Sequence, residues 1–107
     1  MEFRHVSVLL EEVINALITD TDGIYVDCTL GGAGHGYEIA NRLTSSGWFI
    51  GIDQDPAAIK AGRERLADTL CRVDIIQGNF RFLDTILADL GIQSVSGILF
   101  DLGVSSY

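Results

Sequence analysis

Short apolar runs alternate with helical patterns along most of this chain, and this alternation restricts the possible folds more than any other feature. Four runs rich in β-branched and aromatic residues predict strands at Ile24–Cys28, Trp48–Ile52, Val73–Ile76 and Val95–Asp101. Consecutive parallel strands need a crossover connection, and a helix usually supplies it in a right-handed unit. The sequence therefore predicts an α/β domain with a parallel sheet covered by helices on both faces.

The segments between these runs have helical periodicity. We expect helices at Val6–Leu17 and Tyr37–Leu43, a third that begins at Asp55-Pro56, and a fourth that ends at Gly91. The third helix is predicted to bury the face formed by Ile59, Gly62, Leu66 and Leu70, and the fourth is predicted from Phe82, Leu83, Ile86, Leu87 and Leu90.

Composition restricts the function. A chain of 107 residues that is 48% hydrophobic and 21% charged is expected to form one folded domain, without a membrane span or a secretory signal. The net charge of -8 argues against binding of a nucleic-acid phosphate backbone by this segment alone. Cys28 and Cys71 have no zinc-ligand spacing, so we expect reduced thiols, no metal site and a cytoplasmic protein, with a structural disulfide as the alternative for the two cysteines.

Polar residues follow each predicted strand. Asp27, Asp53, Asn79 and Asp101 lie at or just after the four carboxyl ends. In open parallel sheets, ligands bind at these ends, where the strand order reverses. We therefore expect the four side chains to converge on one crevice.

Glycines crowd the segment after the first strand. Gly32, Gly34 and Gly36 form a GxGxG pattern that lets a ligand approach the backbone next to a helix N-terminus. The dinucleotide fingerprint GxGxxG does not fit, because its third glycine would fall on Tyr37. A tight turn without any ligand is the alternative. His35 would lie at the start of the helix, where its ring could touch a cofactor.

Two further positions match a nucleoside site. Asp53 ends the second strand, where a carboxylate can accept both hydroxyls of a ribose. The alternative is that Asp53 and Asp55 only cap the next helix, and we expect this role for Asp55. Phe80 follows the third strand, where its ring could pack against adenine, with core packing as the alternative.

Five segments together resemble the MraW/RsmH family of bacterial methyltransferases. They are HVSVLLEE (5–12), YVDCTLGGAGHG (25–36), GIDQDPAA (51–58), GNF (78–80) and GILFDLGVSS (97–106). They occur in family order and cover nearly the whole chain. The resemblance implies a Rossmann-like class I fold that uses S-adenosyl-L-methionine to methylate N4 of a cytidine in 16S rRNA.

The resemblance also implies which residues bind the cofactor. They are Ala33, Gly34, His35, Asp53, Phe80 and Asp101. From the glycine turn itself we expect Asp27 and Gly31 to give adjacent support. Asp101 is in addition the candidate catalytic residue, as an acceptor for the hydrogens of the target amino group.

Family members are about three times as long, so residues 1–107 are expected to be the N-terminal part of the cofactor-binding domain, with the first four strands of an incomplete sheet. The substrate-binding insert and the C-terminal half would then be absent, and the fragment alone would be inactive toward 16S rRNA in the small ribosomal subunit. Its exposed apolar surface is expected to favour self-association. A fragment of an NAD-dependent oxidoreductase and a non-enzymatic Rossmann-like interaction module are the alternatives.

Overall fold

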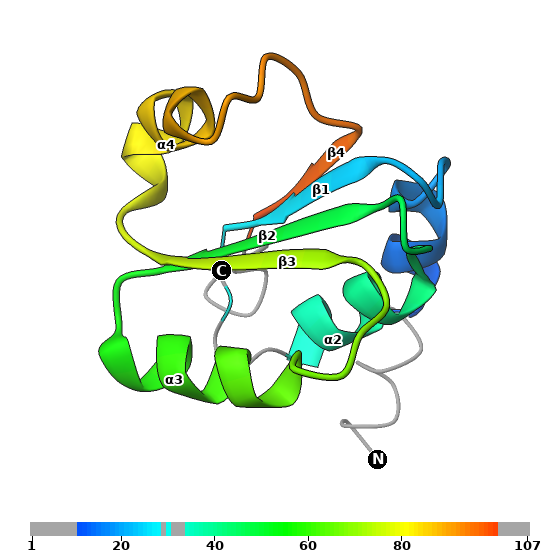
Figure 1. Ribbon diagram of the computed structural model, residues 1–107, viewed down its shortest axis with the longest axis horizontal. Coiled ribbons are helices and arrows are strands. Elements are labelled where there is room, and N and C mark those ends of the chain that lie inside the picture. The colour runs from blue at the N-terminus through cyan, green and yellow to red at the C-terminus, as the bar shows by residue number, and fades with distance from the viewer. Residues whose placement is uncertain (1–10, 29, 31–33, 101–107) are drawn as a thin grey trace, which may run out of the picture.

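The structure is a computed structural model that describes residues 11–28, 30 and 34–100. Within these residues a parallel sheet has the order β3-β2-β1-β4 (Figure 1). The elements are β1 (Ile24–Asp27), α2 (Gly34–Arg42), β2 (Trp48–Asp53), α3 (Pro56–Arg65), β3 (Arg72–Gln77), the 3-10 helix η1 (Phe80–Phe82), α4 (Leu83–Asp89) and β4 (Gly97–Leu99). Residues 11–17 are also helical. The predicted α/β class and the parallel sheet are confirmed.

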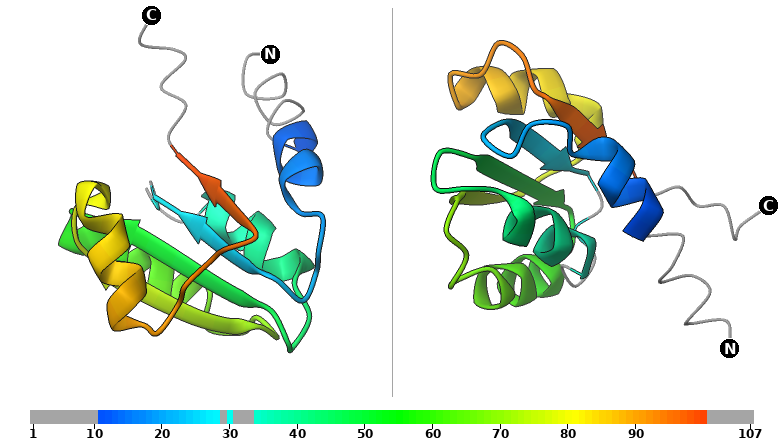
Figure 2. Two further views of the ribbon diagram at one scale, coloured as in Figure 1. Left: turned by 90° about the horizontal axis from the view of Figure 1, so that it is seen from above. Right: turned by 90° about the vertical axis from the view of Figure 1, so that its right-hand side faces the viewer.

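Helices cover both faces of the sheet. Helices α2 and α3 lie on one face and α4 on the other, as the views in Figures 1 and 2 show. On the α2 and α3 face, Tyr25, Phe49 and Ile75 point into a core that also contains Ile14 of the first helix. The alternate residues Val26 and Ile50 point to the opposite face, as the twofold repeat of a strand requires. On that face Leu83, Ile86, Leu87 and Leu90 pack against them.

The helix-start and helix-stop signals are confirmed. The side chain of Asp55 accepts a hydrogen bond from the backbone N–H of Ala57 at 2.9 Å, with Pro56 in the first turn. Gly91 has φ +77°, a left-handed conformation that lets the chain leave α4. The helix-start and helix-stop signals depend only on residues that are neighbours along the chain, so both could be predicted from the sequence.

Two predicted helix positions are wrong. Leu70 is 80% exposed, because α3 ends at Arg65 and the N–H of Leu66 makes the last helical bond, to Gly62 O. Leu70 therefore lies beyond the helical repeat. Phe82 is 58% exposed, because it ends η1 and α4 begins one residue later.

Other boundaries shift by a few residues. Helix α2 begins at Gly34 rather than Tyr37, and β4 spans Gly97–Leu99 rather than Val95–Asp101. The predicted start of the first helix, from Val6 to Leu10, lies outside the described residues, as does Asp101. Ile14 is fully buried and Val13 and Leu17 are partly buried, so the described part of that helix packs an apolar face against the core.

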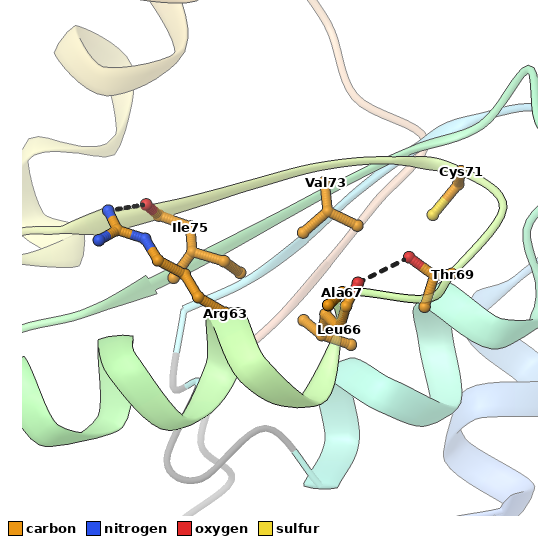
Figure 3. Close-up of a pocket in the computed structure, with 7 residues that line it drawn as sticks. All are labelled: Arg63, Leu66, Ala67, Thr69, Cys71, Val73 and Ile75. Atoms are coloured by element: carbon orange, nitrogen blue, oxygen red, sulfur yellow. Dashed lines mark hydrogen bonds between the residues drawn. The ribbon is translucent and has the colours of Figure 1, made fainter.

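The outer edge of β3 is partly blocked by an arginine. Arg72 N donates to Gly47 O and Gly78 N to Asp53 O, so the even-numbered residues of β3 bond toward β2. The backbone groups of the odd-numbered Ile75 therefore point away from β2. Arg63 Nη2 donates to Ile75 O at 3.2 Å, so a guanidinium satisfies a carbonyl that a foreign strand would otherwise pair with (Figure 3).

Candidate functional site

The carboxyl ends of the strands form the candidate site. The chain steps outward from β1 to β2 and β3, and then returns to the other side of β1 for β4. The strand order thus reverses between β1 and β4, the point where α/β sheets bind ligands. The register pairs Asp27 with Gly51 and Asp53 with Gln77. The polar residues that end β1 and β2 therefore lie at the same end of the sheet.

Asp53 is held in a defined turn. It ends β2 and is partly buried. Its Oδ1 accepts a hydrogen bond from Asp55 N at 2.8 Å, and its carbonyl accepts one from Gly78 N at 2.9 Å. The side chain therefore takes part in the turn before α3, whose N-cap is Asp55, while the carboxylate stays at the carboxyl end of the strand.

The loops after β2 and β3 are joined by an amide pair. Asn79 Oδ1 accepts from Arg81 N at 3.0 Å and caps η1, while Asn79 Nδ2 donates to Gln54 Oε1 at 3.4 Å. Gln77 Nε2 also donates to Gln54 O at 3.3 Å. Gln54, the residue after Asp53, therefore bonds to Asn79, the residue before Phe80. The sequence did not reveal this role of Gln54.

Phe80 is 48% exposed, so the core-packing interpretation of this residue is wrong. Its ring meets the ring of Phe100 edge to face, with centroids 5.6 Å apart and an interplanar angle of 73°. Phe100, which directly follows β4, is 44% exposed. Phe100 extends the apolar run of the strand and resembles a core residue, so the sequence pattern did not distinguish it as a site residue.

The glycine-rich segment is anchored by Leu30. Leu30 N donates to Ile52 O at 3.3 Å, and its side chain is 1% exposed. A Cβ atom placed on Gly51 would lie 2.6 Å from Leu30 Cδ1, and one placed on Gly62 would lie 2.7 Å from Leu30 Cδ2. A Cβ on Gly36 would lie 3.3 Å from Cδ1. These three glycines form a socket that the Leu30 side chain fills, a contact that no local sequence pattern indicates.

The other predicted residues of this segment are only partly described. Gly34 and His35 begin α2, so His35 lies at the helix start as predicted, and its side chain is partly buried. Asp27 is fully buried at the end of β1. Ala33, Gly31 and Asp101 lie outside the described residues. The structure thus brings the end of β2 together with the loop after β3, and Phe80 together with the segment after β4.

Both cysteines are buried as thiols. Burial, together with the negative charge of the adjacent Asp27, raises the pKa of Cys28 to about 11. Burial also raises the pKa of Cys71. Because a thiolate is the reactive form of cysteine, neither residue has the properties of a nucleophile near neutral pH.

A hollow of about 320 Å³ lies between α3 and β3, away from the carboxyl ends of the strands (Figure 3). Its lining is Arg63, Leu66, Ala67, Thr69, Cys71, Val73 and Ile75, and it includes none of the predicted site residues. In the part of the chain that the structure describes, no cluster of three or more His, Cys, Asp or Glu residues is arranged to hold a metal ion. Nor does any described helix have the length and apolarity to cross a membrane.

A parallel sheet with a reversal of strand order, flanked by helices, defines a Rossmann-like α/β domain, with a conserved type of ligand position at its strand ends. Within that class the chain belongs to the MraW methylase family, whose model matches residues 2–107.

Relatives agree with this assignment. The chain is 59% identical over 107 residues to the ribosomal RNA small subunit methyltransferase H of Lachnospira eligens, and 56% identical to that of Clostridium botulinum strain Hall. Each match covers 100% of this chain and 34% of the relative. The chain therefore spans about a third of the length of these relatives.

Two solved structures share the fold. A Clostridium thermocellum protein, described as a candidate rRNA-methylase, matches 75% of this chain and 43% of its own, with a TM-score of 0.64 and 20% identity. An arsenic(III) S-adenosylmethionine methyltransferase from Chlamydomonas reinhardtii matches 71% of this chain and 33% of its own, with a TM-score of 0.51 and 15% identity. At these identities the likeness shows the fold alone.

Proposed function

We propose that this chain is the S-adenosyl-L-methionine-binding part of an enzyme that methylates N4 of a cytidine in 16S rRNA. The observation that supports this most directly is the position of Asp53 at the carboxyl end of β2, beside the reversal of strand order, in a chain of the MraW methylase family. The names of the relatives support an rRNA substrate. A cytoplasmic location follows from that substrate.

The residues at the strand ends fit an adenosine-containing ligand. Asp53 supplies carboxylate oxygens for ribose hydroxyls, and the half-exposed ring of Phe80 supplies an apolar surface for the base. Gly34 and His35 begin α2, where backbone N–H groups without helical partners are available to the ligand's polar groups. We assign Ala33 and Asp101 to the same site from the family resemblance.

Bound S-adenosylmethionine would supply the electrophilic methyl group. The role that we assign to this chain is to hold the ligand in one orientation, since alignment contributes much of the acceleration in group transfer. The amino group of cytosine is a weak nucleophile because its lone pair is delocalised into the ring. Asp101 is our candidate for the acceptor of its hydrogens. With a net charge of -8, this chain is unsuited to holding the RNA, so we assign RNA binding to other parts of the full-length enzyme.

Ligand binding by the 107-residue chain tests the proposal. We expect isothermal titration calorimetry to detect binding of S-adenosylmethionine and no binding of NAD, because the glycine segment lacks the dinucleotide fingerprint. We also expect no transfer of labelled methyl groups from S-adenosylmethionine to 16S rRNA by this chain alone. Preferential binding of NAD would favour an oxidoreductase fragment, and binding of neither ligand would favour a non-enzymatic module.

We further propose that the chain self-associates through its β4 side. In the described sheet β4 pairs with β1 alone, whereas the outer edge of β3 carries the Arg63 contact. A strand edge that no neighbouring strand covers is a template for pairing with a second chain. Sedimentation velocity should therefore show a mass that rises with protein concentration. A monomer at all concentrations would contradict this expectation.

A further inference from the structure

The contact between Phe80 and Phe100 joins segments that follow the two outer strands of the described sheet. Phe80 follows β3 and Phe100 follows β4, and β2 and β1 lie between those strands. The rings nevertheless meet edge to face at 5.6 Å. Both rings remain about half exposed, so the pair lies at the surface of the carboxyl-end region rather than in the core.

The backbone on each side of the pair is held by hydrogen bonds. Asn79 caps η1 and bonds to Gln54, which restricts the position of the Phe80 backbone. Leu99 O accepts from Cys28 N at 2.8 Å, which extends the pairing of β1 and β4 up to the residue before Phe100. The remaining freedom of Phe80 is the rotation of its side chain. The contact with Phe100 restricts that rotation, because edge-to-face pairs have a preferred geometry.

We propose that Phe100 is a positioning residue for the cofactor site, and that its ring holds the ring of Phe80 in the orientation that receives the adenine base. This inference rests on the proposed function of the chain. A ring that is oriented before the ligand arrives loses less conformational freedom on binding, so its pre-orientation raises the affinity for the ligand. Phe100 acts through Phe80 and need not touch the ligand.

Affinity measurements on leucine variants test the proposal. An aromatic pair is worth about 0.5–1.5 kcal/mol, so Phe100→Leu should weaken binding of S-adenosylhomocysteine by about two- to tenfold. Adenosine alone should lose affinity by the same factor, since the effect concerns the base. Phe100→Tyr keeps the ring and should restore affinity to the unsubstituted level, whereas a purely steric role at this surface position would not require an aromatic ring.

Two further variants separate this role from a general one. Phe82→Leu removes another exposed ring of η1 and should leave affinity unchanged. In a chain that carries Phe80→Leu, the additional change Phe100→Leu should have no effect on affinity, because the ring that it positions is gone. Circular dichroism and thermal unfolding without ligand should show that each variant is folded.

The outcomes are distinguishable. Unchanged affinity in Phe100→Leu, failure of Phe100→Tyr to restore binding, or an equal loss with and without the Phe80 ring would each overturn the positioning role and leave the proposed function intact. If the unsubstituted chain binds neither S-adenosylhomocysteine nor adenosine, both the proposed function and this inference fail.

Discussion

Leu30→Ala is expected to lower the free energy of unfolding by about 2–5 kcal/mol, the range for truncating a buried leucine. The side chain is 1% exposed and fills the socket formed by Gly36, Gly51 and Gly62. The socket comes from three different elements, so it cannot collapse easily around a smaller residue. Chemical denaturation, followed by circular dichroism, measures the change.

Leu70→Ala is the matched control for this substitution. It removes the same atoms from a side chain that is 80% exposed, so we expect a change within about 0.5 kcal/mol. A loss below about 1 kcal/mol in Leu30→Ala would contradict the socket, because it would mean that the site closes around the missing atoms. Since Leu30 lies inside the glycine-rich segment, we also expect its truncation to weaken cofactor binding.

Asp53→Ala is expected to weaken S-adenosylmethionine binding by about 1–3 kcal/mol, or roughly 5- to 150-fold, because the ribose hydroxyls would lose their acceptor. Calorimetry on the 107-residue chain measures this effect. Equal affinity in the variant and the unsubstituted chain would remove Asp53 from the site.

Two control variants separate ligand binding from the local turn. Asp53→Asn keeps an oxygen that can accept from Asp55 N, so the turn should persist while the carboxylate is lost. We expect it to bind nearly as weakly as Asp53→Ala. Asp55→Ala removes the cap of α3 and should cost about 0.5–2 kcal/mol of stability while leaving ligand affinity unchanged.

Much of the candidate site could be predicted because it depends on chain order. A polar residue that follows an apolar strand lies at a carboxyl end whatever the sheet order is, so the positions of Asp27, Asp53 and Asn79 followed from the pattern. The interactions of these residues did not follow from it. The bond between Asn79 and Gln54 joins loops 25 residues apart, and the partner of Phe80 lies beyond a further helix and strand.

The sequence by itself determined the α/β class, the parallel sheet, the cap at Asp55 and the stop at Gly91, because periodicity and capping arise among neighbouring residues. Tertiary structure alone decided the order β3-β2-β1-β4, the socket around Leu30 and the pairing of Phe80 with Phe100. It also decided that Leu70 is exposed, because the position at which α3 ends depends on which of its residues is the last to pack against the core. The physical reason is the same for all four features. Each depends on contacts between residues that are distant along the chain, and a local sequence pattern does not specify such contacts.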